Sequence, residues 1–207
     1  DKGHLWIVLE LCRGGELYEA IAEKVRTGPC GGLDEQQGRL FFRQMLYAAS
    51  YLHACHIVHR DVKTENFLLL GEPGTQHGDV LKLCDFGTAV VLSPEHPRAM
   101  ERIGTLSYTA PEVYERRGAT VLADAWSLGV VLYVILVGAS PFRIHGDEPR
   151  DLTVRRIQAG EYDQSRAAWL GLSRQAQDLV QRFLLVDESV RLTSTEALRH
   201  PWVHPGD

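Results

Sequence analysis

The sequence predicts an α+β fold that is mainly helical and has a few short strands along one edge. Apolar residues recur at helical spacing in the range 40–52 and again from residue 121 onward. Short apolar runs at 57–58, 67–70 and 80–84 have instead the length and composition of strands. Because no internal repeat divides the chain, we expect its 207 residues to form one domain or one large lobe.

Turn and cap residues predict the first elements. A strand is expected over residues 5–11, and a glycine pair ends it before a helix over 17–25. The Gly and Pro content of residues 26–32 predicts a loop. Asp34 is then placed to cap the long helix that follows, with Gln37 three residues later.

Similar signals predict the later elements. Ser173 is placed to cap a helix with an apolar stripe over 176–184, and residues 193–196 form a capping-box pattern before the last helix. The longest apolar run, 128–137, is too short to span a bilayer, so we expect a buried helix and no membrane span. Residues 86–108 show no strong periodicity, which is typical of a long functional loop.

Composition narrows the class of protein. The chain has 22 Lys and Arg residues against 27 Asp and Glu residues, and its net charge of -5 argues against nucleic acid as the main partner. Its four cysteines lie far apart, so we expect free thiols in a reducing compartment rather than a disulfide framework or a zinc site. The expected location is intracellular, in the cytoplasm. The cysteines are Cys12, Cys30, Cys55 and Cys84.

Two segments contain the groups needed to move the terminal phosphoryl group of ATP. Residues 59–66 read His-Arg-Asp-Val-Lys-Thr-Glu-Asn, and residues 85–87 read Asp-Phe-Gly. Such an enzyme needs a carboxylate base, a cation for phosphate and oxygen ligands for Mg²⁺. An Asp-Phe-Gly on its own is usually an ordinary turn, but two ordered motifs are harder to obtain by chance. The candidate groups are Asp61, Lys63, Asn66 and Asp85.

A third motif, Ala-Pro-Glu at 110–112, follows at the distance expected for the end of an activation loop. The three motifs together resemble the protein kinase family, and the resemblance runs from about residue 5 to residue 202. It implies a partial kinase domain over 1–207, with the N-terminal lobe almost entirely missing. Residues 1–12 would be the last small-lobe strand and the hinge, and residues 13–204 the mainly helical C-terminal lobe.

The resemblance implies a role for each candidate residue. Asp61 would orient the acceptor hydroxyl, Lys63 would neutralise charge on the transferred group, and Thr105 would contact both. Asn66 and Asp85 would hold Mg²⁺. The residues that would bind ATP, through the hinge, the ribose, the purine, the phosphates or the metal, are Glu10, Cys12, Glu16, Lys63, Asn66, Leu68 and Asp85.

Three further residues are expected to support the structure around the site and not to take part in catalysis. The family uses an Asp like Asp124 to bond the backbone of the catalytic loop, and it pairs a Glu like Glu112 with a late Arg, here Arg191.

Glu101 stands where many kinases carry a Thr that must be phosphorylated. A fixed carboxylate there can pair with Arg60, so we expect activity without activation-loop phosphorylation. The alternative is that Glu101 is a solvated residue in a mobile loop.

The position of Lys63 resembles that of Ser/Thr kinases, which implies Ser/Thr acceptors in protein substrates. Glu16 indicates a preference for a basic residue upstream of the acceptor, although it can equally be a helix-capping residue. Val134 stands where kinases that require a second Arg in the substrate keep a carboxylate. We therefore expect the substrate to need only one basic residue.

Segments such as 138–142 and 196–202 resemble the calcium/calmodulin-dependent group, especially calcium-dependent protein kinases. A calcium-sensing regulatory domain downstream is therefore an expected partner.

The pattern departs from the family in two places. Thr64 replaces the usual Pro, with a small expected effect. Upstream of the hinge there is no Gly-rich loop, strand Lys or helix Glu, so we expect the 207 residues alone to be an inactive fragment of a longer kinase. The alternative class is a catalytically inactive relic that acts as a binding or scaffold module. Such a module has no chemical need for all four of the groups named above.

Overall fold

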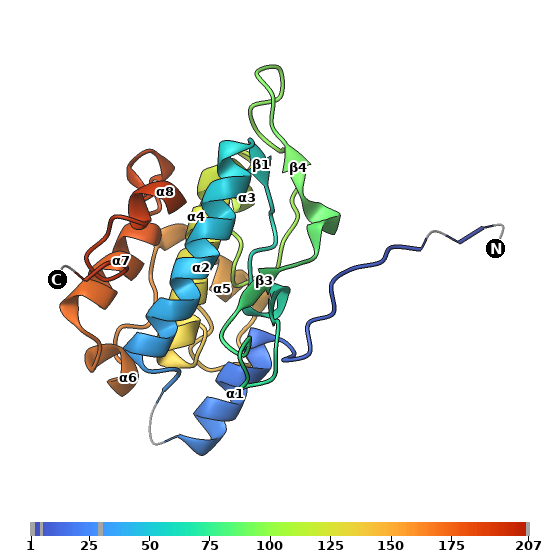
Figure 1. Cartoon of the computed structure of the whole chain (residues 1–207). Helices are drawn as coiled ribbons and strands as arrows, with labels where there is room; N and C mark the ends of the chain where they lie inside the picture. The colour runs from blue at the N-terminus through green and yellow to red at the C-terminus, as the bar shows by residue number, and fades with distance from the viewer. Residues whose placement is uncertain (1–2, 5, 29–30, 206–207) are drawn as a thin grey trace.

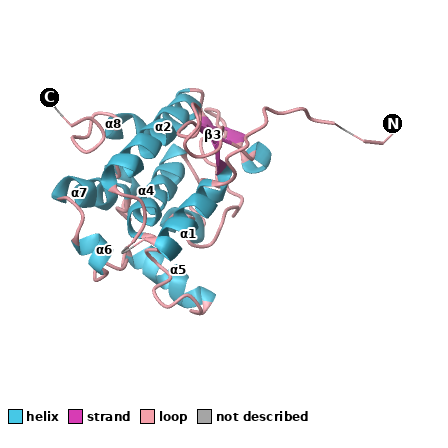
Figure 2. Cartoon of the chain, turned by 60° about the horizontal axis from the view of Figure 1, so that its bottom comes forward, coloured by secondary structure: helices cyan, strands magenta, loops and turns pink. Residues whose placement is uncertain are grey.

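The structure, a computed structural model, describes residues 3–4, 6–28 and 31–205. Helices dominate it, and the strands are short and lie near one side (Figure 1, Figure 2). The predicted α+β class with a mainly helical body is confirmed. The helices are α1 (Leu17–Thr27), α2 (Glu35–Ala54), α3 (Pro111–Tyr114), α4 (Val121–Val137), α5 (Arg150–Ala159), α6 (Ala167–Leu170), α7 (Arg174–Phe183) and α8 (Ser194–Ala197).

The strands form two antiparallel pairs. In the first, β2 (Phe67–Leu69) pairs with β3 (Leu81–Leu83). In the second, β1 (Ile57–Val58) pairs with β4 (Val90–Val91). Three of these strands were predicted, two of them one or two residues too long. β4 was not predicted, because two residues in an irregular loop become a strand only through their pairing with β1.

The predicted strand over 5–11 is wrong for residues 6–11, and Leu5 lies outside the described residues. This segment is extended but has no strand hydrogen bonds, and Val8 is 95% exposed. A strand needs a neighbour to accept and donate its backbone bonds, and no described residue pairs with this stretch. Pairing starts later, where the amides of Arg13 and Gly14 donate to Leu70 and Leu69 at 3.0 and 2.9 Å. Figure 1 shows the earlier residues running away from the helices.

Helix starts follow the predicted caps. The Asp34 carboxylate accepts from the Gln37 amide at 2.9 Å, and the Ser173 hydroxyl accepts from the Ala176 amide at 3.2 Å. The capping box at 193–196 is also formed. α1 runs two residues further than expected, so the loop after it is shorter. Pro29 and Cys30 in that loop lie outside the described residues.

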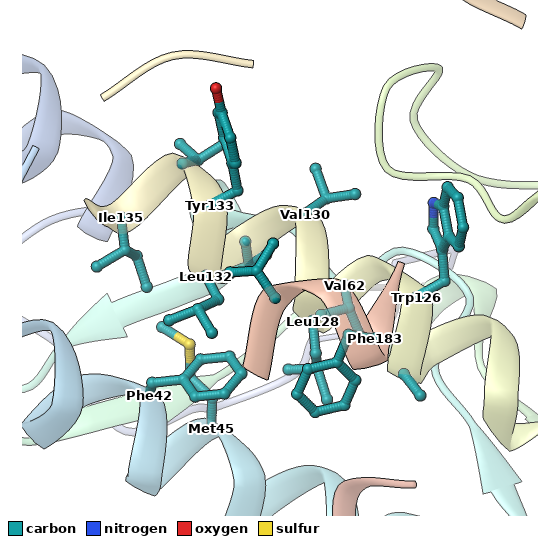
Figure 3. Packing of buried hydrophobic residues seen from close by; sticks show 14 of the residues in the cluster. Phe42, Met45, Val62, Trp126, Leu128, Val130, Leu132, Tyr133, Ile135 and Phe183 are labelled. Atoms are coloured by element: carbon teal, nitrogen blue, oxygen red, sulfur yellow. The ribbon is translucent and has the colours of Figure 1, made fainter. Parts of the chain in front are cut away.

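The core is built around α4. Every residue from Ala123 to Val137 is buried, so this helix has apolar neighbours on all sides. Figure 3 shows Leu128 and Leu132 facing Phe42 of α2 and Phe183 of α7. A Cβ at Gly129 would lie 2.5 Å from the Phe183 Cβ, so glycine permits the close approach of α7. In the described part of the chain, no helix has both the length and the apolarity needed to cross a membrane.

A buried ion pair ties the end of the lobe to α3. The Arg191 guanidinium donates to both Glu112 carboxylate oxygens at 2.7 and 2.9 Å, and both side chains are fully buried. Arg191 also donates to the carbonyls of Leu122 and Leu185. Both partners are thus satisfied, as burial of charge requires. The predicted partnership is formed, and Arg191 further connects the start of α4 to residues after α7.

We predict that Glu112→Gln lowers the free energy of unfolding by about 3–5 kcal/mol, because it leaves the Arg191 charge buried without a counterion. Urea unfolding followed by circular dichroism measures this. The control is Asp151→Asn, which removes an exposed partner of Arg155 at 3.5 Å and is expected to cost less than about 0.5 kcal/mol. Equal midpoints for the two variants would contradict the structural role of the pair.

Candidate active site

A buried carboxylate from α4 fixes the loop that carries the candidate catalytic residues. Asp124 accepts the backbone amides of His59 at 2.8 Å and Arg60 at 2.9 Å, and it also contacts His53 Nε2 at 3.1 Å. Arg60 has φ of 68°, a left-handed conformation that a non-glycine residue adopts only when its surroundings hold it there. The bonds to Asp124 supply that restraint, which is the support role expected for this residue.

Asp61 lies at the centre of a compact hydrogen-bonded group. One carboxylate oxygen accepts from the amide and the hydroxyl of Thr105 at 3.1 and 2.8 Å. The other accepts from Lys63 Nζ at 2.6 Å and from Asn66 Nδ2 at 3.3 Å. Lys63 Nζ also donates to the Thr105 hydroxyl at 3.3 Å. The structure thus brings together all four residues predicted to be catalytic, although they come from two loops 42 residues apart.

These contacts determine the protonation states of Asp61 and Lys63. Burial raises the pKa of Asp61, but the bonds and charge of Lys63 and the bonds from Thr105 outweigh it, so the pKa lies below its usual range. Burial lowers the pKa of Lys63, but the bond and charge of Asp61 outweigh it, so that pKa is raised. Asp61 is therefore a carboxylate, able to accept a hydrogen bond, and Lys63 is a cation.

The predicted metal ligands lie at the same end of the β2–β3 pair. The Cys84 amide donates to the Asn66 carbonyl at 2.9 Å, which places Asp85 next to Asn66 across the two strands. Asn66 Nδ2 donates to the Asp61 carbonyl at 2.8 Å, and this bond orients the side chain and leaves its oxygen as an available acceptor. Asp85 is held at φ of 59° with one oxygen accepting from Gly87 at 3.3 Å.

This donor set fits Mg²⁺ only as a partial shell. A neutral amide oxygen and a carboxylate are hard ligands of the kind that Mg²⁺ prefers. The described residues contain no group of three or more His, Cys, Asp or Glu side chains that could hold an ion by themselves. Mg²⁺ usually keeps several waters and takes phosphate oxygens, so two protein ligands suffice when a nucleotide completes the shell.

A cleft of about 500 Å³ lies beside Asp85. Leu68 lines it from β2, and Cys84 lines it from the position directly after β3. Leu9 and Cys12 line it from the extended first segment. Most of its surface is apolar, as expected for a pocket that takes a flat ring. Of the residues predicted to bind ATP, the cleft includes Glu10, Cys12, Leu68 and Asp85, and its lining does not include Glu16, Lys63 or Asn66.

The two acidic residues predicted near this cleft have different surroundings. Glu10 makes an ion pair with Lys82 Nζ at 3.0 Å, a contact that its sequence position did not predict. Glu16 pairs through its backbone with Leu68 and occupies the N-cap position of α1. Its side chain makes no capping hydrogen bond. Glu16 therefore lies where a helix-capping residue would, as the alternative predicted, but its carboxylate does not cap the helix.

Cys84 lines the cleft as a half-buried thiol. Burial raises the pKa of Cys84, and the neighbouring Asp85 charge raises it further. The thiolate is therefore disfavoured at neutral pH, which makes Cys84 a weak nucleophile.

The activation loop is attached to the catalytic loop by the predicted pair. Arg60 Nη1 lies 3.1 Å from Glu101 Oε2, with the Arg side chain 8% exposed and the Glu side chain 74% exposed. Arg60 Nε also donates to the Thr88 carbonyl at 2.5 Å, and the Thr88 hydroxyl donates to the His59 carbonyl at 2.8 Å. Arg60 thus contacts the loop at two places, one near its start and one thirteen residues later.

A second attachment of the same loop was missed. Arg98 and Arg117 both donate to Glu188, at 2.9 and 2.7 Å, and Ala99 forms an antiparallel bridge with Ala119. Glu188 is almost buried, so two arginines balance its charge. No sequence spacing links these residues, and only the three-dimensional arrangement reveals the contact.

Comparison with known proteins agrees with the family resemblance found in the sequence. A family model described as "Protein kinase domain" matches residues 1–203. Serine/threonine-protein kinase SRK2F of Arabidopsis thaliana is 39% identical over 206 residues, covering 98% of this chain and 55% of that protein. Serine/threonine-protein kinase SAPK4 of Oryza sativa subsp. japonica is 39% identical over 202 residues, covering 96% and 52%. Ribosomal protein S6 kinase alpha-2 of Mus musculus is 35% identical over 203 residues, covering 98% and 27%. The chain spans about half the length of the first two proteins and about a quarter of the third.

Proposed function

Because this chain belongs to the protein kinase domain family, we propose that the protein transfers the γ-phosphoryl group of ATP to hydroxyl groups of Ser and Thr in other proteins. The observation that carries this proposal is the placement of Asp61. Its carboxylate is held between Lys63 and Thr105 at 2.6 and 2.8 Å, ionised and part-buried. A binding module gains nothing from a carboxylate and a cation positioned in this way.

The proposed chemistry assigns one task to each side chain. The acceptor hydroxyl donates its hydrogen bond to Asp61, and the carboxylate takes the proton as the oxygen–phosphorus bond forms and the bond to ADP breaks. Lys63 lies beside Asp61 and neutralises charge on the transferred group. Asn66 and Asp85 would hold Mg²⁺, which supplies charge stabilisation on the phosphate oxygens. Leu68, Glu10 and Cys12 line the cleft proposed for the adenine ring.

Three narrower features belong to the same proposal. The Lys63–Thr105 contact at 3.3 Å supports Ser and Thr acceptors, and two relatives carry that activity in their names. Glu16, which makes no capping bond, supports a basic residue before the acceptor. The motif segments named above support calcium-regulated signalling in the cytoplasm, with a calcium-sensing domain as partner. The competing proposal is an inactive lobe that serves as a scaffold.

We predict that Asp61→Asn in the full-length protein lowers phosphoryl transfer from ATP to a basic Ser peptide by about 10²–10⁴-fold, because the neutral amide cannot take the proton. Transfer of radiolabelled phosphate measures the rate. The control, Asp151→Asn on the exposed face of α5, keeps the wild-type rate. Wild-type protein that transfers no phosphate to any peptide would favour the scaffold instead.

We further propose that Glu101 replaces a phosphorylated residue in ordering the activation loop. Its carboxylate contacts the largely buried Arg60 at 3.1 Å, where a phosphate would make stronger bonds. The Glu188 contacts hold the same loop at a second place. Two fixed attachments support activity that does not depend on modification of the loop.

We predict that Glu101→Gln lowers kcat up to about fivefold, because an exposed ion pair contributes about 0.2–1 kcal/mol. Steady-state kinetics on phosphatase-treated full-length protein measure this. The control is Glu95→Gln, an exposed residue of the same loop with no ion pair among the described residues. If both variants keep the wild-type kcat, the Arg60 pair has no part in activity.

A further inference from the structure

A small pocket of about 180 Å³ opens next to Gly104, on the segment that leads into the candidate active site. It is separate from the cleft proposed for the nucleotide and shares no lining residue with it. The lining contains two arginines and no acidic residue. Its residues are Arg102, Ile103, Gly104, Thr109, Tyr114 and Arg150.

The two arginines supply the pocket with positive charge that no acidic group in the described part of the chain neutralises. The Arg102 guanidinium lies over the Tyr114 ring, 4.6 Å from its centroid, so stacking holds it in place. Neither Arg102 nor Arg150 makes an ion pair within 4 Å of a described carboxylate. Other arginines of the same lobe do, including Arg98, Arg117, Arg156, Arg166 and Arg191.

Both side-chain hydroxyls of the pocket are already hydrogen-bonded. The Tyr114 hydroxyl donates to the Leu106 carbonyl at 2.6 Å, and the Thr109 hydroxyl donates to the Thr105 carbonyl at 2.9 Å. Among the side chains of the lining, the guanidinium groups are therefore the donors left for a ligand. Arg150 is the first residue of α5, where the helix dipole disfavours a cation, so the fold itself gains nothing from this charge.

The pocket lies close to the reaction centre. Gly104 precedes Thr105, whose amide and hydroxyl both donate to Asp61. Gly104 has φ of 125°, and a Cβ there would lie 2.9 Å from the Arg60 carbonyl oxygen, so the two loops touch. Arg102 therefore lies three residues from Thr105, the residue that orients the Asp61 carboxylate.

Resting on the proposed function, we infer that this pocket binds an anionic side chain of the acceptor protein, either a carboxylate or a phosphate. Guanidinium groups bind both through paired, charge-assisted hydrogen bonds, and the volume admits one such group. Glu16 is proposed to take a basic residue before the acceptor, so the anionic residue is expected after it. Substrates would then carry a positive charge on one side of the acceptor and a negative charge on the other.

The test uses full-length protein and a set of Ser peptides with one basic residue upstream. Glu, Gln or phosphoserine is placed in turn at each of the five positions after the acceptor. We expect wild-type protein to prefer Glu over Gln about five- to tenfold in kcat/KM at one of these positions. Arg102→Gln and Arg150→Gln each reduce that preference, with no change for the Gln peptide. A larger effect with phosphoserine than with Glu assigns the pocket to phosphate.

The control is Arg155→Gln, which removes a positive charge from the same helix but from outside the pocket lining, and it keeps the preference. Equal use of Glu and Gln peptides at every position, or equal losses for both in the pocket variants, overturns the inference while phosphoryl transfer stands. If wild-type protein transfers no phosphate, the proposed function fails. The pocket is then judged by fluorescence anisotropy with labelled Glu and Gln peptides, where equal affinities overturn it.

Discussion

The contact of Asp124 with the backbone of His59 and Arg60 is the constraint on which the candidate site depends. A carboxylate buried on α4 is costly unless it is hydrogen-bonded, and here two amides and His53 satisfy it. In return it holds Arg60 in a left-handed conformation, from which the side chain reaches Thr88 and Glu101. α4 is itself surrounded by α2 and α7, so the core determines where the catalytic loop lies.

The other contacts of the site depend on the position of the catalytic loop. Asp61 follows the fixed backbone and is oriented by Thr105 from the far end of the activation loop. That loop is attached at Glu101, and again through Arg98 to Glu188, close in sequence to the residue that pairs with Glu112. Core packing, loop attachment and the orientation of one carboxylate therefore form a continuous set of contacts. The basic pocket beside Gly104 is built on the same segment.

Local signals predicted the helix caps, and the family resemblance implied some long-range pairs, such as Glu112 with Arg191. The remaining long-range contacts could not be predicted from the sequence. Caps such as Asp34 and Ser173 depend on neighbours three residues away, so spacing alone identified them. The motif residues came together as the family resemblance implied. The strand expected over 5–11 failed because strands depend on partners, and β4 was missed for the same reason. The contacts of Glu188 and the pocket at Arg102 join segments that no spacing rule connects.

Hydrogen exchange at the backbone amides of His59 and Arg60 tests the central constraint most directly. In the wild type both amides donate to buried oxygens of Asp124 and should exchange slowly. Asp124→Asn offers only one acceptor oxygen, so at least one of the two amides should exchange much faster, while amides of α7 keep their protection. Unchanged exchange at both positions would show that something other than Asp124 holds the loop and would contradict this account.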